Sequence, residues 1–489
     1  MRINWCRKRE LGFALLVLGA LAISACHPVG PDYAKPKIPP PPKWNAGMSE
    51  GLRATEASDA TLARWWTTLR DPTLNRLIDR AIDGNLDLRR ATAVVREARA
   101  RRGIANADRF PTITASGLAA GQRGSDRMGR AANVGLFTAG FDAGWEVDVF
   151  GRVRRSIEAA NASLQATGEL LRDTLVSLLG EVAVNYVEVR QLQTRLAIAE
   201  DNLKLQEDTY KLAVSRFQAG LTTRLDVDQA GYNVADTRSR IPALRSQLTQ
   251  AKNRLDVLVG ENPGRLSELL RKPGPIPVGP PEVAVGVPAG MLRRRPDIRR
   301  AERILAARTA AVGIAVAAKY PRFSLSGALG YGTLTKGQPL SLGNIVASLG
   351  GSALFTVLDG GRIRQNIEVQ DAVAEQALID YESSILLALE EVENALTAYA
   401  QEQVRRRSLL DAAAAAGRAV NLVRSRYAAG LVDFQRVLDS ERALLSFQDQ
   451  VAVSDGAVTT DLIRLYKALG GGWGRTPPSA PPKTSQLRK

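Results

Sequence analysis

The chain carries an internal duplication at a constant spacing of 210 residues. Residues 215–221 (Ser-Arg-Phe-Gln-Ala-Gly-Leu) recur as residues 425–431 (Ser-Arg-Tyr-Ala-Ala-Gly-Leu). Six further matches share this offset: residues 87–91 with 297–301, Pro111 with Pro321, Ser116-Gly117 with Ser326-Gly327, Gly151–Arg154 with Gly361–Arg364, Glu181-Val182 with Glu391-Val392, and Gly260 with Gly470. One offset at seven separate places, without gaps, indicates two copies of one structural unit.

Each copy contains two stretches with the alternation of a half-buried strand. From Phe137 to Val149 every odd position is apolar, whereas the even positions include Asp142, Glu146 and Asp148. This period predicts strands at about residues 111–124, 133–150, 321–335 and 344–358. A sandwich with one solvated face is the alternative, but four strands make a poor sandwich. A transmembrane strand needs about 9–11 residues, so these strands are long enough for a membrane β-barrel.

Two long helices are expected after the strands of each copy, at residues 152–218 and 222–260 and at 362–429 and 432–470. Residues 152–218 contain no proline and would span about 100 Å at 1.5 Å per residue. Apolar residues recur at spacings of three, four and seven, which predicts a heptad-like seam; a generic coiled coil is the alternative. The seam residues are Leu164, Leu171, Leu175, Leu178, Val182, Tyr186 and Val189, then Ala374, Tyr381, Ile385, Ala388, Val392, Leu396 and Tyr399. Pro242 predicts a bend in the first return helix.

Four membrane strands from one chain cannot close a barrel, because two edges would remain unpaired in lipid. Two copies would give eight strands, whose interior the side chains would fill. Three copies would give twelve strands and leave room for a lumen. The sequence therefore favours a homotrimer.

The N-terminus reads as a processing signal. A basic stretch from Arg2 to Arg9 precedes a short apolar core, so residues 1–25 are expected to be a signal peptide. The segment Leu-Ala-Ile-Ser-Ala-Cys resembles a lipobox and predicts lipidation of Cys26; the alternative is an ordinary secretory signal that contains a cysteine. Removal of residues 1–25 would leave one cysteine, and hence no intramolecular disulfide.

The composition argues against enzymes and nucleic-acid binding proteins. His27 is the only histidine and follows the predicted lipidation site, which excludes a buried histidine base or a multi-histidine metal site. No nucleotide-binding glycine loop of the usual spacing occurs. The net charge is +16, but four basic residues and one Glu lie in segment 1–25, which leaves +13. The signal segment argues against nucleic acid as the partner of this basic chain. We expect no catalysis and no cofactor; the alternative left by the composition is carboxylate or lysine chemistry.

Motifs along most of the chain resemble those of NodT/OprM-type outer-membrane factors. The first half carries residues 29–33 (Val-Gly-Pro-Asp-Tyr), Trp65-Trp66 and Asp71-Pro72. The second half carries residues 294–298 (Arg-Arg-Pro-Asp-Ile), 323–327, 359–362 and 427–431. The resemblance spans about residues 26–473, and the proline-rich residues 474–489 lie outside it.

The resemblance implies a mainly α chain with a membrane β-barrel, of the TolC-like kind. A trimer would form a twelve-stranded barrel continuous with a long periplasmic α-helical barrel. The chain would then divide into a lipidated segment (26–70), a first repeat (71–260), a linker or equatorial segment (261–293), a second repeat (294–470) and a disordered tail (471–489). Its place would be the outer membrane, in contact with lipid, with a periplasmic adaptor and an inner-membrane RND pump as partners.

The implied function is that of an outer-membrane channel that exports drugs or other small solutes. The alternatives are the outer channel of a type I protein or peptide secretion system, which is disfavoured by the lipobox, and a coiled-coil surface lipoprotein, which is disfavoured by the membrane strands. By resemblance, the periplasmic gate comprises Asp439, Tyr427, Gln435 and Arg442. The alternative is that Asp439 is a solvated carboxylate paired with Arg436 or Arg442. The expected docking tips for the adaptor are Gly220, Leu221, Thr222, Gly430, Leu431 and Val432.

Overall fold

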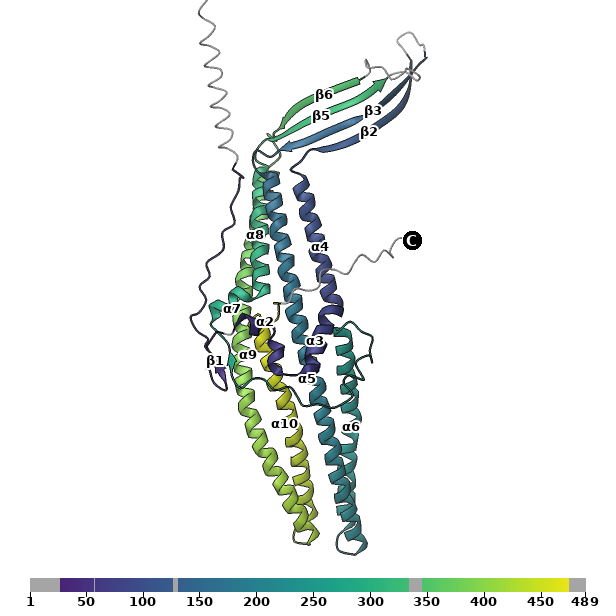
Figure 1. Ribbon diagram of the computed structural model, residues 1–489, viewed down its shortest axis with the longest axis vertical. Coiled ribbons are helices and arrows are strands. Elements are labelled where there is room, and N and C mark those ends of the chain that lie inside the picture. The colour runs from purple at the N-terminus through teal and green to yellow at the C-terminus, as the bar shows by residue number, and fades with distance from the viewer. Residues whose placement is uncertain (1–26, 57, 126–130, 334–344, 475–489) are drawn as a thin grey trace, which may run out of the picture. The chain divides into compact units, whose positions relative to one another are not determined.

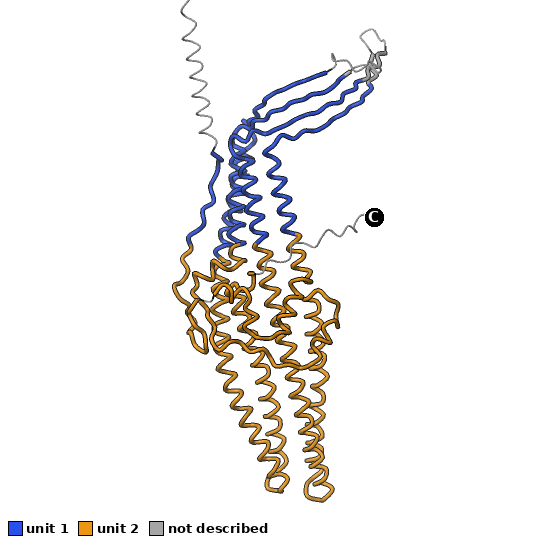
Figure 2. Tube along the Cα trace, in the orientation of Figure 1, with its two compact units in different colours: residues 1–37, 94–168, 300–382 blue, residues 38–93, 169–299, 383–489 orange. Residues whose placement is uncertain are grey.

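The computed structural model describes residues 27–56, 58–125, 131–333 and 345–474 (Figure 1). The predicted signal peptide, Cys26 and most of the predicted tail lie outside these residues. Contacts divide the chain into two units (Figure 2). Unit 1 comprises Met1–Lys37, Val94–Gly168 and Arg300–Glu382, and unit 2 comprises Ile38–Ala93, Glu169–Arg299 and Ser383–Lys489.

The helices repeat the offset found in the sequence. The pairs are α4 (Leu86–Ala107) with α8 (Pro296–Ala317), α5 (Arg152–Gln218) with α9 (Arg362–Ala428), and α6 (Arg224–Leu258) with α10 (Phe434–Ala468). The helices α6 and α10 begin two residues later than expected because Thr223 and Asp433 are extended N-caps. The side chain of Asp433 accepts a hydrogen bond from the amide of Arg436. Helix α6 continues through Pro242.

Unit 1 contains one antiparallel sheet in the order β2-β3-β5-β6. Its strands are β2 (Thr112–Ser125), β3 (Ala131–Val147), β5 (Arg322–Thr333) and β6 (Ile345–Leu354). The register aligns odd with odd positions at every pairing, so that Phe141 lies between Ala115 and Leu329. The even positions form the opposite face, where the hydroxyl of Ser116 donates to the carboxylate of Asp142 over 2.7 Å. Among the described residues, β2 and β6 are each paired on one side.

Unit 2 contains two antiparallel helical hairpins, α5 with α6 and α9 with α10, near the lower end of Figure 1. Most of the predicted seam is buried along both long helices, and Val182, Tyr186, Val392 and Leu396 are fully buried. Leu164, Leu171 and Ala374 are half-buried. The heptad-like spacing therefore identifies the packed side of each helix, because positions three and four apart share one face.

Short elements pack against the long helices in unit 2. They are β1 (Leu52–Arg53), which pairs in parallel with β4 (Val283–Ala284), α2 (Asp59–Ala63), η1 (Trp65–Leu69), α3 (Pro72–Gly84) and α7 (Pro288–Arg294). Trp65 is buried and stacks on Tyr466, with 5.7 Å between ring centroids. Asp71 caps α3 and accepts a hydrogen bond of 2.7 Å from the hydroxyl of Tyr186. The tryptophan and Asp-Pro motifs thus hold the short elements against α5 and α10. No described helix has the length and the apolar character required to cross a membrane.

Candidate functional site at the hairpin tips

The two turns expected as docking tips have the same backbone conformation. Gly220 and Gly430 have φ of +73° and +76°, which is a left-handed conformation that glycine adopts without strain. The amide of the next residue bonds the carbonyl five residues before it, Leu221 to Arg216 over 2.8 Å and Leu431 to Arg426 over 2.9 Å. Both leucine side chains remain exposed, at 65% and 73%. Each hairpin therefore ends in a hydrogen-bonded turn with an exposed apolar side chain.

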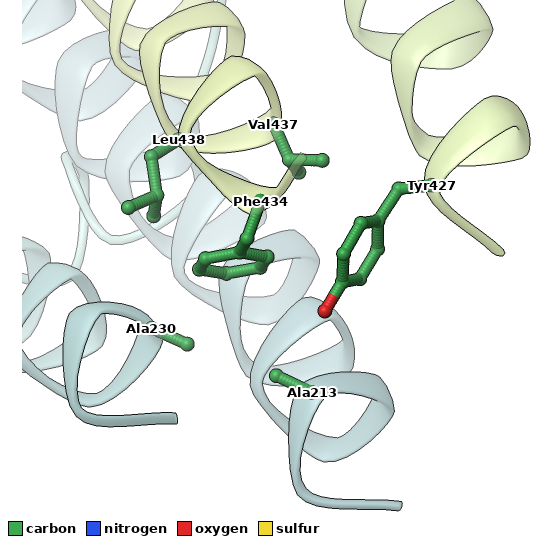
Figure 3. Close-up of a cluster of buried hydrophobic side chains, with 6 residues drawn as sticks. All are labelled: Ala213, Ala230, Tyr427, Phe434, Val437 and Leu438. Atoms are coloured by element: carbon green, nitrogen blue, oxygen red, sulfur yellow. The ribbon is translucent and has the colours of Figure 1, made fainter. Parts of the chain in front are cut away.

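Just behind the turns, the two hairpins meet in a buried apolar cluster, which Figure 3 shows. Tyr427 is 3% exposed, and its ring centroid lies 5.2 Å from that of Phe434. The guanidinium of Arg216 lies 4.9 Å from the centroid of the Tyr427 ring and donates to the carbonyl of Ala428 over 3.0 Å. The members of this tip cluster are Ala213, Ala230, Tyr427, Phe434, Val437 and Leu438. Residues of four helices, α5, α6, α9 and α10, are thereby joined around one aromatic side chain.

Asp439 is exposed on α10, one turn beyond Gln435. The amide Nε2 of Gln435 donates to the carboxylate of Asp439 over 2.8 Å. Arg442 has other partners: its Nε donates to Asn233 over 3.2 Å, and its guanidinium lies 5.2 Å from the ring centroid of Tyr232. The structure thus joins two of the four expected gate residues, Gln435 and Asp439.

The other two expected gate residues each join α9 or α10 to the first hairpin. Tyr427 contacts Arg216 of α5, and Arg442 contacts α6. The proposed pairing of Asp439 with Arg436 or Arg442 is absent from the described contacts, since Arg436 pairs with Asp433 and Arg442 with Asn233. Whether Asp439 lines a gate depends on other copies of the chain and stays a prediction.

A buried carboxylate close to the tips was missed in the sequence. Glu441 is 1% exposed, and its Oε1 accepts a hydrogen bond of 2.6 Å from the hydroxyl of Thr209. Burial raises the pKa of Glu441, and this is partly offset by the hydrogen bond from Thr209 and by Arg424, whose Nε lies 3.9 Å away. The sequence did contain a sign that Glu441 faces the packed side of its helix, because Leu438, Glu441 and Leu445 follow the three-four spacing of a seam.

The chemistry of the tips is that of an interface. Among residues 27–474 with the gaps stated above, no cluster of three or more His, Cys, Asp or Glu side chains could hold a metal ion. The tips instead combine exposed leucines, paired carboxylates and a tyrosine in contact with a guanidinium and a phenyl ring. Such side chains suit packing between helices and docking of another protein.

Comparison with known proteins gives two matches to one family, described as outer membrane efflux protein, at residues 77–261 and 287–471. The two matched segments begin and end 210 residues apart, so they coincide with the duplication. The chain belongs to the outer membrane efflux protein family. Its location is therefore the outer membrane, and the family's members serve transport as channel components.

Individual relatives and solved structures agree with this membership. The chain is 32% identical over 468 residues to nodulation protein T of Rhizobium leguminosarum bv. trifolii, covering 93% of this chain and 96% of that protein. It is 31% identical over 474 residues to outer membrane protein OprJ of Pseudomonas aeruginosa, with 96% and 97% covered. The solved structure of the outer-membrane channel OprN has a TM-score of 0.86 and 36% identity, and the match covers 91% of this chain and 99% of that one. The resemblance read from the motifs is thus confirmed, as is the duplicated, mainly helical channel fold.

Proposed function

We propose that three copies of this chain form the outer-membrane channel of a tripartite RND-type efflux system, which carries drugs or other small solutes and catalyses no reaction. A periplasmic adaptor and an inner-membrane pump would be its partners. The observation that carries the proposal is the open four-stranded sheet. Its odd positions carry exposed apolar side chains, such as Phe141 (60% exposed) and Leu349 (88% exposed).

The two free edges of the sheet support the trimer. Unpaired backbone groups cost several kcal/mol each in lipid, so β2 of one copy needs β6 of another. Eight strands would be filled by side chains, whereas twelve leave a lumen. Helix α9 also exposes apolar side chains that water would not favour: Val369, Ile379, Leu386 and Leu387, at 55–68%. A neighbouring copy would cover them.

The anchor would be a lipid on Cys26, which precedes the first described residue, His27. Acyl chains would hold the N-terminus in the outer membrane beside the barrel. A Cys26→Ala chain can still insert through its strands, because the barrel supplies its own apolar surface.

The gate would lie at the tips of the second hairpins. Three copies of Asp439 around one axis would bring like charges together and attract cations. Each carboxylate already accepts a hydrogen bond from Gln435, and the packing of Tyr427 and the contact of Arg442 tie α9 and α10 to the first hairpin. These ties would keep the resting channel closed.

We propose that the channel carries small solutes rather than proteins. Relatives of this chain include a solvent efflux protein, a toluene efflux protein and a cation efflux protein, which are 30–32% identical to it. Their names describe those proteins, and they share the export of small species. Deleting the gene should raise the cellular accumulation of dyes and drugs and should leave the set of secreted proteins unchanged. A deletion strain that accumulates no more dye than its parent, but loses a secreted protein, would favour the secretion channel.

The docking tips can be tested by photo-cross-linking in cells. Cross-linkers at Thr222 and Val432 should capture a periplasmic adaptor, because both residues flank the exposed leucines of the turns. Asp126, which lies outside the described residues, is the control and should capture none. Capture at Asp126 together with none at the turns would mean that the proposed orientation is inverted.

A further inference from the structure

The first residues after Cys26 are bound by a buried arginine at the start of α5. The side chain of Arg155 is 3% exposed, and its Nη2 donates to the carboxylate of Asp32 over 2.7 Å and to the carbonyl of Gly30 over 3.2 Å. Its Nε donates to the carbonyl of Val29 over 3.1 Å, and Glu158 pairs with Nη1 over 2.8 Å. Hydrogen bonds to a charged donor are stronger than those between neutral groups, so this guanidinium holds both backbone and side chain.

Glycines allow the close approach that these bonds require. A Cβ at Gly30 would lie 2.5 Å from the Cα of Gly313, and a Cβ at Gly151 would lie 2.6 Å from Pro28. A Cβ at Gly313 would lie 2.9 Å from the side chain of Arg155. Real side chains do not tolerate such distances to backbone atoms. We call Gly151, Arg155 and Gly313 the cradle, and residues 28–35 the strap.

The rest of the strap is bound along α8. The hydroxyl of Tyr33 donates to Glu302 over 3.2 Å, and Lys35 pairs with Glu302 over 2.8 Å. The guanidinium of Arg303 lies 5.4 Å from the ring centroid of Tyr33. At its other end, the amide of Val29 donates to the carbonyl of Phe150 over 3.1 Å, three residues beyond the last residue of β3. The strap is therefore attached at the foot of the sheet, within unit 1.

The duplication supplies an internal comparison. At the offset of 210 residues, Gly361 corresponds to Gly151 and Gly103 to Gly313, but Gln365 stands where the cradle has Arg155. A Cβ at Gly103 or Gly361 would meet nothing within 4 Å. The second copy thus keeps the glycines without the arginine and without a bound segment among the described residues. The arginine is present at the copy that holds the strap.

We propose that the cradle is the docking site for the N-terminal strap and that Arg155 fixes the height at which the acyl chains on Cys26 enter the membrane. This inference rests on the proposed lipidation of Cys26. Two residues separate Cys26 from the clamped Val29, so a docked strap leaves the acylated cysteine little freedom relative to the foot of the sheet. An undocked strap would let the same lipid sample a wide range of heights.

The test compares the whole acylated channel with an Arg155→Gln variant. This variant gives the cradle the glutamine that the second copy has at Gln365. Hydrogen exchange of a peptide covering residues 28–33 reports docking, because the Val29 amide is bonded to Phe150. Loss of the charged hydrogen bonds should speed exchange at least about tenfold. A nitroxide at residue 27 should change from one narrow depth in the bilayer to a broad distribution. Gln365→Arg is the matched control and should change neither measurement.

Two further measurements separate the possible failures. Incorporation of tritiated palmitate should be equal in wild type and Arg155→Gln, and absence of label in both would refute lipidation while leaving docking to be judged by exchange. If Arg155→Gln fails to assemble, Gly30→Ala tests the same site from the strap, since its new Cβ would collide with Gly313. Unchanged exchange and unchanged depth in an assembled, palmitate-labelled Arg155→Gln or Gly30→Ala channel would overturn the proposal.

Discussion

Replacing Glu441 with Gln is expected to stabilise the hairpin tips at neutral pH. The carboxylate is 1% exposed, its Oε1 accepts one hydrogen bond from Thr209, and its Oε2 has no hydrogen-bond partner among the described residues. The nearest cation, Arg424, lies 3.9 Å away and is itself partly solvated. Burial of the charge therefore outweighs the compensation by Arg424, and this raises the pKa of Glu441.

The magnitude follows from the buried charge, because the amide nitrogen of Gln would also lack a partner at the position of Oε2. A charged group costs more to bury without partners than a neutral one, and we take the difference as about 1–3 kcal/mol. Gln retains the size of the side chain and an acceptor for Thr209 but carries no charge. The local opening of α10 should thus become rarer by a factor of about 5–150. Because the folded-state pKa is raised, the folded protein binds this proton more tightly than the unfolded chain does. The advantage of Gln is present above the raised pKa and disappears as the pH falls below the ordinary value of 4.5.

Hydrogen exchange of the amides between Phe434 and Leu445 measures this opening. Wild type and variant are compared at pH 7 and again near pH 4, so that the intrinsic exchange rate cancels at each pH. Glu207→Gln is the matched control, because Glu207 pairs with Arg238 at a side-chain exposure of 38% and should contribute under about 1 kcal/mol. Faster or equal exchange of Glu441→Gln at pH 7 would refute the reasoning, since the attraction of Arg424 would then exceed the cost of burial.

Three other expectations concern the gate, the membrane face and the anchor. Asp439→Ala removes the acceptor for Gln435, so the resting channel should show larger conductance in planar bilayers; Asp411→Ala, elsewhere on the hairpin, should not. Leu325→Arg places a charge on the odd face and should reduce barrel assembly by about 2–4 kcal/mol, whereas Ser324→Arg on the even face should cost less; equal losses of assembled, heat-modifiable channel would contradict the register. Cys26→Ala should abolish palmitate labelling, and label that persists would refute lipidation.

Much of the architecture could be predicted from the sequence because it repeats. The alternation of apolar and polar residues along the strands predicted that Phe141 and Leu329 lie on the apolar face of the sheet. The register pairs these two residues on neighbouring strands. The seam around Val182 and Val392 predicted the buried side of both long helices. These patterns depend on the local periods of strand and helix, which one chain displays without reference to its neighbours.

Partners between distant segments could not be predicted in this way. Tyr427 and Arg442 were grouped with Asp439 because they are near it in sequence and match a family pattern. In the folded chain their partners are Arg216, Asn233 and Tyr232, which lie on the first hairpin. Proximity along α10 gave the one contact between Gln435 and Asp439, since residues four apart on a helix are neighbours.

The duplicated unit, its strands, its hairpins and their turns can be read from the amino-acid sequence, because hydrophobic period and glycine placement act within a few residues. Which polar groups are buried, and which partners hold them, depends on the packing of distant segments. In the sequence, Arg155 is one of many arginines in helical stretches, and only the fold shows that Val29 and Gly30 are bound to it. Glu441 likewise has the sequence context of a solvated carboxylate, and only the fold shows that it is buried and bound to Thr209 of α5. The cost or benefit of a charge depends on the water it loses and on the groups that replace that water, and both come from segments far away in the chain.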